Sequence, residues 1–183
     1  MTMARYDIDG LQLELVTGDI TDQEGFDAVV NAANAELMPG GGVAGAIHRS
    51  AGPELAEACR PLAPIQPGQA VVTEGFALPN PYVIHCLGPI YGRDEPAHER
   101  LAECYQNALN LAEERSLESI AFPAISTGAF GYPVEEAARV ALRTIGRAAP
   151  QLKSLRRIRF VLFDDDSLVT HERAAREVLP DVA

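Results

Sequence analysis

Cysteine motifs are missing from this sequence. Its three cysteines, Cys59, Cys86 and Cys104, are widely spaced, odd in number and never arranged as CxxC. This pattern disfavours a disulfide framework and a zinc site, so we expect no bound metal. The thiols are expected to act as small buried apolar groups. We predict no cofactor, and a nicotinamide enzyme is disfavoured because the Rossmann fingerprint is missing.

Long apolar stretches are also missing. No run approaches the roughly 20 apolar residues that a membrane-spanning helix needs. The N-terminal residues, MTMARYDIDG, lack the apolar segment of a secretory signal. We therefore predict a cytoplasmic protein with no membrane partner.

Positive charge is scarce. The chain has 15 Lys and Arg residues against 26 Asp and Glu residues, which gives a formal net charge of −11. This balance opposes nonspecific binding to a phosphate backbone, so nucleic acid is not expected as a partner. The basic cluster at residues 153–159 is interpreted mostly as a solvated turn before a strand. An acidic chain can still hold one diphosphate, because backbone N–H groups bind anions without a cationic side chain.

Length and patterning predict one α/β domain. With 183 residues, 47% of them hydrophobic, the chain suits a single core, and we assign residues 1–183 to one domain. After a hairpin turn at Asp9-Gly10, strand and helix patterns alternate. We predict a three-layer α/β/α sandwich with a central mixed, largely parallel sheet. Strands are expected at residues 6–8, 11–16, 28–32, 69–76, 82–87, 119–125 and 158–163, and helices at 42–50, 53–60, 95–115, 133–149 and up to 179.

The most informative stretch runs from residue 27 to residue 52. An apolar strand pattern is followed by Asn31 and Asn34. Three glycines come next, at residues 40–42, and a helical pattern begins directly after them. Glycine lets the backbone approach a phosphate closely, and the first N–H groups of a helix have no intrahelical partner. The layout predicts an anion-binding site rather than a plain connecting loop. It is not a Walker loop, because no Lys-Ser/Thr follows, and it is not GxGxxG.

Two further strand ends carry candidate ligand groups. Asp19 follows the strand at 11–16, and a second glycine-containing loop, residues 126–132, follows the strand at 119–125. Ligands of α/β sheets bind outside the carboxyl ends of strands, so these loops are expected to flank one cleft. From the residues alone, a turn or helix-cap role explains Asp19 equally well.

These motifs resemble the macrodomain family, which binds ADP-ribose. NAAN, GGGV and AI, then STGAFGY, together with GDI, YVIHCLGP and IAFPAISTG, occur in the family's order and spacing over residues 11–179. The resemblance implies that the Asp19 carboxylate accepts a hydrogen bond from the adenine amino group and that Phe163 stacks near adenine. It also implies that Asn34 binds the distal ribose, which makes Asn34 the candidate catalytic residue.

The same resemblance implies the remaining contacts. The diphosphate is expected between two loops, and the ligand-binding set, besides Asp19, Asn34 and Phe163, is Ile20, Gly41, Gly42, Val43, Ser126, Thr127, Gly128, Ala129 and Phe130. The residues do not indicate whether Phe130 or Tyr132 closes over the ligand. His85 is interpreted as structural, and His48 as lying behind the ligand-contacting groups.

The chain departs from the hydrolytic branch of the family at one position. That branch has an aspartate after GGGV that supports the attacking water, whereas this chain has Ala44, which cannot accept a proton. Two accounts stay open. Either the protein slowly hydrolyses mono-ADP-ribose linkages or O-acetyl-ADP-ribose esters, as some family members with alanine here do, or it only reads ADP-ribose or ADP-ribosylated protein. A nucleic-acid-binding macrodomain is a third class, which the net charge disfavours.

Overall fold

The computed structural model describes residues 3–179, and all of its strands join one sheet. The strands are β1 (Met3–Ile8), β2 (Leu11–Thr17), β3 (Ala28–Ala32), β4 (Ala70–Glu74), β5 (Tyr82–Cys86), β6 (Ser119–Phe122) and β7 (Arg157–Leu162). The helices are α1 (Gly42–Ala51), α2 (Glu54–Cys59), α3 (Ala97–Glu114), α4 (Val134–Ala148) and α5 (Asp165–Val178), with short 3-10 turns at Arg60–Leu62 and Ala149–Gln151. The expected domain limits, residues 1 and 183, lie outside the described residues.

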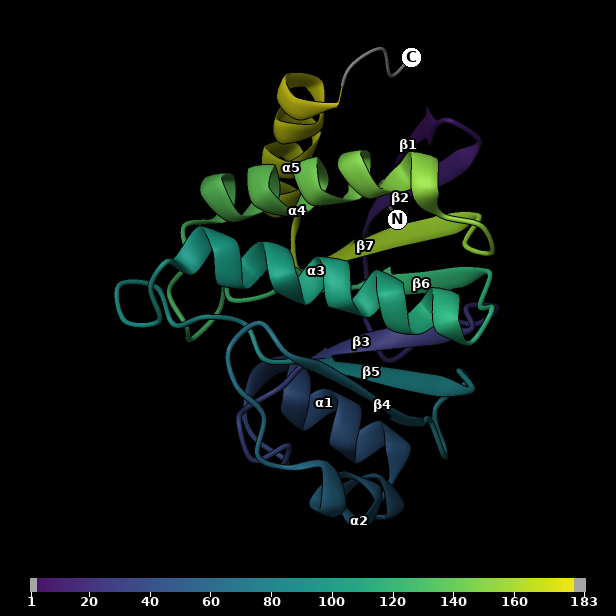
Figure 1. Ribbon diagram of the computed structural model, residues 1–183, viewed down its shortest axis with the longest axis vertical. Coiled ribbons are helices and arrows are strands. Elements are labelled where there is room, and N and C mark those ends of the chain that lie inside the picture. The colour runs from purple at the N-terminus through teal and green to yellow at the C-terminus, as the bar shows by residue number, and fades with distance from the viewer. Residues whose placement is uncertain (1–2, 180–183) are drawn as a thin grey trace.

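The sheet has seven strands in the order β1-β2-β7-β6-β3-β5-β4 (Figure 1). The five inner strands are parallel to one another, and the edge strands β1 and β4 are antiparallel to their neighbours. Helices α3, α4 and α5 cover one face, and α1 and α2 cover the other. The predicted three-layer α/β/α sandwich with a largely parallel sheet is therefore confirmed.

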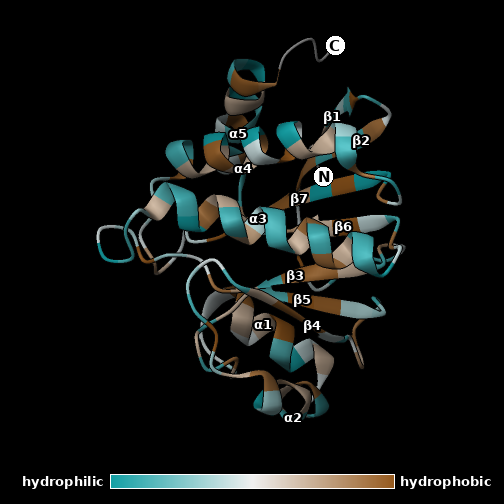
Figure 2. Ribbon diagram, in the orientation of Figure 1, coloured by the Kyte–Doolittle hydropathy of each residue, from teal (hydrophilic) through white to brown (hydrophobic). Residues whose placement is uncertain are grey.

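Alternating side chains give the inner strands two apolar faces, because successive residues of a strand point to opposite sides of the sheet. On β7, Ile158 and Phe160 pack with α3, α4 and α5, while Val161 packs in the cluster that includes α1 and α2. Figure 2 shows the hydrophobic colour along β3, β5 and β7, and alternating bands along the helices. Burial of both faces explains why these strands read as continuous apolar runs in the sequence.

Local backbone chemistry explains where β1 ends, where β2 begins and where β6 ends. Asp9 and Gly10 have φ values of 53° and 87°, the two positive angles of a type I′ hairpin turn, as predicted. The strand expected at 119–125 ends earlier, at Phe122, because Pro123 has no N–H to donate to the ladder. The strand expected at 158–163 ends at Leu162, which leaves Phe163 beyond the ladder.

His85 lies in a buried polar cluster within the sheet. Its side chain is fully buried, its Nδ1 lies 3.1 Å from the Asn31 amide nitrogen, and its Nε2 lies 2.9 Å from the Thr73 hydroxyl. Both ring nitrogens of His85 therefore have polar partners within the sheet. Burial lowers the pKa of His85 to about 3, and the neighbouring His48 adds to this effect. These contacts agree with the structural role inferred for His85.

Stability is expected to fall as the pH drops from 7 to 5. The unfolded chain protonates His85 near its ordinary pKa of about 6.5, whereas the folded protein keeps it neutral down to about pH 3. Stability is therefore fully present above the unfolded pKa and is lost as the pH falls toward the folded value. For this residue the loss between pH 7 and pH 5 is about 2 kcal/mol. Urea unfolding of the wild type and of His85→Gln at both pH values measures it.

The other histidines with lowered pKa values, His48 and His171, are retained in both proteins. Their burial acts in the same direction, so the difference between the two proteins isolates His85. An equal loss of stability in wild type and His85→Gln would show that His85 is not the titrating group.

Candidate functional site

The carboxyl ends of five parallel strands meet at one edge of the sheet. Residues 18–21 follow β2, Phe163 follows β7, residues 123–132 follow β6, residues 33–41 follow β3, and residues 87–94 follow β5. Because the parallel strands share one direction, all these loops lie along the same edge. The loops predicted from the sequence to bind a ligand therefore all lie at this edge of the sheet.

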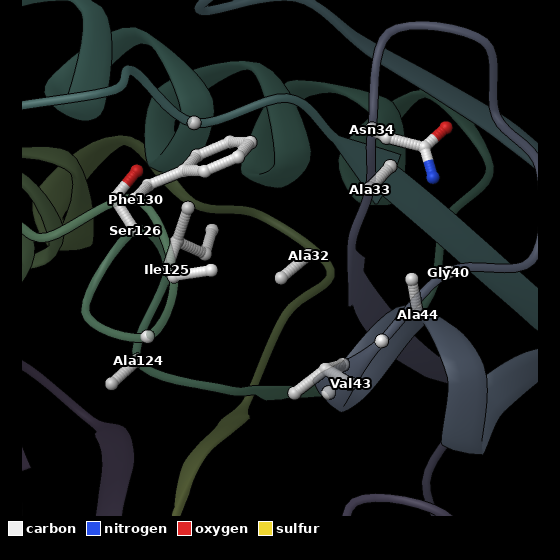
Figure 3. A pocket seen from close by; sticks show the side chains of 15 residues that line it. Ala32, Ala33, Asn34, Gly40, Val43, Ala44, Ala124, Ile125, Ser126 and Phe130 are labelled. Carbon is white, nitrogen blue, oxygen red and sulfur yellow. The ribbon is translucent and has the colours of Figure 1, made fainter.

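A cavity of about 320 Å³ opens in the middle of this edge, between the loop after β3 and the loop after β6 (Figure 3). In Figure 3, Ile125, Ser126 and Phe130 form one wall, and Val43 and Ala44 belong to the opposite one. The lining residues are Ala32, Ala33, Asn34, Gly40, Gly41, Gly42, Val43, Ala44, Gly88, Ala124, Ile125, Ser126, Gly128, Ala129 and Phe130. Eight of the predicted ligand-binding residues are thus brought together here.

The wall that includes Val43 and Ala44, here called the first wall, combines a glycine loop with the N-terminus of α1. Gly42 opens the helix with a φ of 57°, and Gly41 caps it without any side-chain hydrogen bond. The first N–H of the helix to find a backbone acceptor is that of Gly45, which donates to the Gly41 carbonyl at 3.3 Å. Within residues 3–179, the N–H groups of Gly42, Val43 and Ala44 have no acceptor. Unpaired amides at a helix N-terminus are an anion-binding arrangement.

The glycine loop lies so close to α1 that a side chain is excluded behind it. A Cβ placed on Gly45 would come within 2.3 Å of the Gly40 carbonyl oxygen. Glycine at this helix position therefore permits the close approach that brings the loop and the helix start into one wall.

Asn34 lines the cavity and also shapes the loop. Its amide nitrogen donates to the Met38 carbonyl at 2.8 Å, and its carbonyl oxygen accepts from the Met38 N–H at 3.0 Å. In Figure 3 the carboxamide points away from Phe130 on the opposite wall. One N–H and one lone pair remain free on the carboxamide, so Asn34 can bind a ligand hydroxyl without giving up the loop contacts. Asn31 is not part of this wall, because it lies in β3 and pairs with His85.

The second wall is a turn fixed by buried hydrogen bonds. Ser126, with a φ of 69°, donates its hydroxyl to the Pro89 carbonyl at 2.8 Å. The Phe130 carbonyl accepts from the Tyr91 N–H at 2.9 Å, and the Tyr132 N–H donates to the Ser126 carbonyl at 2.9 Å. Tyr132 is buried against Tyr91, with ring centroids 4.8 Å apart. These contacts tie the second glycine loop to the segment after β5.

The rim of the second wall leaves its backbone amides available. Within residues 3–179, the N–H groups of Gly128, Ala129 and Phe130 have no backbone or side-chain acceptor. Thr127 is the one member of this loop's predicted set that does not line the cavity, and its hydroxyl donates to the Ala124 carbonyl at 2.8 Å. Residues of both loops whose amides have no acceptor within residues 3–179 thus line the cavity.

Three predicted residues lie on the same edge but outside the cavity. Asp19 is exposed, and its carboxylate accepts hydrogen bonds from the Thr21 hydroxyl at 2.7 Å and the Thr21 N–H at 2.9 Å. Both bonds hold the pKa of Asp19 below its usual value, so the group is ionised at neutral pH. Ile20 is buried under the loop, and Phe163 is 94% exposed. The Gly18 N–H donates to the Leu162 carbonyl at 3.2 Å, which places the Asp19 and Phe163 segments side by side.

The part of the chain that the structure describes lines the cavity without any ionisable side chain. None of its fifteen lining residues, within the described range 3–179, is an acid, a histidine, a lysine or an arginine. Ala44 is among them and is 5% exposed, while Glu36 is exposed and does not line the cavity. His48 is buried on α1, and its two ring nitrogens have no hydrogen-bond partner among the described residues. Residues 3–179 also contain no group of three His, Cys, Asp or Glu side chains placed to hold a metal ion.

Gly88 is the lining residue that sequence reasoning missed most clearly. It follows β5, and a Cβ placed on it would lie 2.2 Å from the Ser126 hydroxyl and 2.6 Å from a methyl group of Ile125. Glycine is therefore required where the loops after β5 and β6 touch. The signal was present in the motif YVIHCLGP, but only the strand order brings that motif to the cavity.

This geometry defines a class of protein. It is an α/β/α sandwich whose ligand cleft lies at the carboxyl ends of the parallel strands, between two glycine-containing loops that present backbone amides. The chain belongs to the Macro domain family, whose model matches residues 30–141.

Full-length relatives agree with this assignment. The chain is 46% identical over 168 residues to an O-acetyl-ADP-ribose deacetylase of Klebsiella pneumoniae, covering 89% of this chain and 95% of that protein. It is 44% identical over 167 residues to a macro domain-containing protein of Chlorobaculum tepidum, covering 91% and 96%.

Solved structures give the same result. The Oceanobacillus iheyensis macrodomain with ADP superimposes with a TM-score of 0.92 at 39% identity, and 96% of each chain is covered. The Trypanosoma brucei macrodomain in complex with ADP-ribose matches with a TM-score of 0.83 at 38% identity, covering 89% of this chain and 68% of that chain. The fold predicted from the sequence is therefore shared with these macrodomains. No helix in the described part of the chain has the length and apolarity needed to cross a bilayer.

Proposed function

We propose that this protein binds ADP-ribose, with the diphosphate held between the two glycine loops. The observation that carries the proposal is that, within residues 3–179, both loops line the cavity with residues whose amides have no acceptor, and that no acidic side chain lines it. A diphosphate needs such donors, and an acid in the cavity would repel it. The ADP-ribose complex of the Trypanosoma brucei macrodomain supports the assignment.

The strand-end loops suggest how the ligand lies. The diphosphate contacts Gly41, Gly42 and Val43 on one side and the loop at 126–130 on the other. The adenine extends toward Asp19, Ile20 and Phe163, and the distal ribose reaches Asn34. We further propose one domain and a cytoplasmic location.

The proposed reaction is hydrolysis of an ADP-ribosyl ester, either a mono-ADP-ribose linkage to an acidic side chain or O-acetyl-ADP-ribose. The relative named as an O-acetyl-ADP-ribose deacetylase supports this class. Water attack at the anomeric carbon of a mono-ADP-ribose ester breaks the bond to the acceptor carboxylate, which leaves as a stable anion and needs no proton from a general acid. Deacetylation of O-acetyl-ADP-ribose instead expels a ribose alkoxide, which has to take its proton from water. Because no ionisable side chain of residues 3–179 lines the cavity, the lining suits the carboxylate leaving group better.

In this mechanism Asn34 and the loop amides hold the ligand and an attacking water in line. A ligand phosphate oxygen polarises the water, because Ala44 supplies no base. The missing acid–base assistance is typically worth about 10²–10⁴-fold in rate, so we expect slow turnover. The second candidate function is a reader module that binds ADP-ribose or ADP-ribosylated protein without chemistry, and the same uncharged cavity favours it.

Calorimetry with ADP-ribose tests the binding half first. The same preparation is then incubated with a protein mono-ADP-ribosylated on Glu or Asp, and with O-acetyl-ADP-ribose, and ADP-ribose release is followed with time. Binding with release supports the hydrolase, and binding without release supports the reader. If ADP-ribose does not bind, the proposed function is wrong and the family fold alone remains.

Asp19→Ala is expected to weaken ADP-ribose binding by about 1.5–3 kcal/mol, the range for a hydrogen bond to a charged group. The carboxylate is exposed and ionised, so its loss removes an acceptor without disturbing the core. Calorimetry measures the change, and Asp22→Ala is the matched control, because Asp22 is an exposed aspartate three residues further along. Equal affinities for Asp19→Ala and Asp22→Ala would remove Asp19 from the site.

A further inference from the structure

A fully buried carboxylate lies on β2, on the sheet face opposite α3, α4 and α5. Glu14 is 0% exposed and pairs with the Nε atoms of Arg157 and Arg159 at 3.0 Å each, and with the Nε atom of Arg5 at 3.4 Å. Burial alone would raise the pKa of Glu14, but hydrogen bonds from both β7 arginines outweigh it and hold the pKa below its usual value. The carboxylate is therefore ionised and anchors the guanidinium groups.

Arg159 connects Glu14 to the turn that carries Asp19. Besides its bond to Glu14, Arg159 donates from Nη1 to the Gln23 side-chain oxygen at 2.9 Å. The Gln23 amide nitrogen then donates to the backbone carbonyl of Asp19 at 2.7 Å. A guanidinium has donors only, so Arg159 fixes which end of the Gln23 carboxamide faces Asp19.

Gln23 is held firmly enough to transmit that orientation. It is 5% exposed, and its backbone carbonyl accepts from the Asn80 amide at 2.8 Å. The guanidinium groups of Arg157 and Arg159 lie 4.5 and 4.7 Å from the centre of the Phe26 ring. These contacts of Gln23 hold the turn after β2 in place, while the Asp19 carboxylate stays exposed at the edge of the sheet.

Stability alone is a weak explanation for this network. Replacing a buried ion pair by apolar residues of similar size is often neutral or stabilising, so a fold does not need such a pair for its own sake. What distinguishes this network is its end point, the backbone of Asp19.

We propose that Gln23, oriented by the Arg159–Glu14 pair, is a positioning residue that directs the Asp19 carboxylate at the amino group of the adenine base. This inference rests on the proposed function. It assigns base selectivity to three residues that do not themselves reach the ligand cavity.

The test compares two ligands in Gln23→Leu, which removes both side-chain hydrogen bonds at nearly constant volume. Calorimetry is performed with ADP-ribose and with its analogue in which hypoxanthine replaces adenine. The analogue presents a carbonyl oxygen to Asp19 where ADP-ribose presents an amino group. Wild type is expected to prefer ADP-ribose by roughly tenfold or more, since one hydrogen bond to a charged group is involved. In Gln23→Leu this preference should fall to about twofold, through weaker ADP-ribose binding and unchanged analogue binding.

Two further variants serve as a second test and as a control. Arg159→Lys keeps the charge beside Glu14 but lacks a fork that reaches both Glu14 and Gln23, so it should also lower the preference. It replaces Gln23→Leu if that variant does not fold. Gln12→Leu is the matched control, because Gln12 is an exposed glutamine on β2, and it should keep the wild-type preference.

The outcomes separate this inference from the proposed function. If wild type does not bind ADP-ribose, the proposed function is wrong and the inference falls with it. If wild type binds ADP-ribose but Gln23→Leu and Arg159→Lys keep its base preference, the positioning role is overturned while the proposed function stands. A purely structural role would weaken both ligands equally and would leave their ratio unchanged.

Discussion

Gly42→Glu is expected to abolish useful ADP-ribose binding, with a dissociation constant at least about 100-fold higher, or about 2.7 kcal/mol. Gly42 lines the cavity, and a Cβ placed on it would meet nothing within 4 Å, so a longer side chain projects into open space. The new carboxylate would occupy the helix N-terminus and compete with the diphosphate for the same amides. Calorimetry with ADP-ribose measures the loss.

The backbone at Gly42 requires a control for strain. Its φ of 57° lies in the region that glycine favours, and a side chain there costs about 1–2 kcal/mol. Gly10→Glu introduces the same charge at a φ of 87°, in the hairpin turn between β1 and β2, away from the cavity. We expect Gly10→Glu to lose similar stability and keep wild-type affinity. Retained affinity in a folded Gly42→Glu variant would mean that the loop does not touch the diphosphate.

Most of the fold could be predicted from local sequence signals. The strand at residues 28–32 was placed correctly, because five small or apolar residues between polar turns leave few alternatives. The Asp9-Gly10 turn and the helix after the three glycines were also found. Strand ends were predicted less well, since the apolar pattern continues to Ile125 whereas β6 ends at Phe122, before Pro123.

The site was predictable where the backbone carries the chemistry and less so where topology does. Two glycine loops could be recognised as anion sites from their composition alone. Gly88 could not, because its role depends on the strand order that brings the loops after β5 and β6 together and leaves no space for a Cβ beside the Ser126 hydroxyl. The hydrogen-bond network of Glu14, Arg159 and Gln23 could not be predicted from the sequence either. Arg159 lies 136 or more positions from its two partners, and only the pairing of β2 with β7 brings them together.

Side-chain direction is the other quantity that spacing does not supply. The resemblance placed Thr127 among the ligand contacts, yet its hydroxyl turns back to Ala124. Asn34 was expected to bind ribose, and its amide is already paired with the Met38 backbone. Each side chain follows from the local turn that its own loop makes, and a turn of this kind is visible only in three dimensions.

Ala44→Asp is expected to accelerate ADP-ribosyl ester hydrolysis by at least about 100-fold, the lower range for a placed general base. Ala44 is the third residue of α1 and lines the cavity, so an aspartate there would face the ligand. An aspartate with its ordinary pKa of about 3.9 is ionised at neutral pH and can accept a proton from the water. Time courses of ADP-ribose release from an ester-linked acceptor measure the effect.

Ala44→Asn separates proton transfer from shape. The amide has the size of the carboxylate and its hydrogen-bonding reach, but it cannot accept a proton at neutral pH. A gain in rate confined to Ala44→Asp would show that the cavity already holds the ester and the water correctly and lacks only a base. Equal rates for wild type, Ala44→Asp and Ala44→Asn, with ADP-ribose still bound by all three, would show the reverse. The limit would then lie in how Asn34 and the two loops orient the ester, and the reader function would be the better account of this cavity.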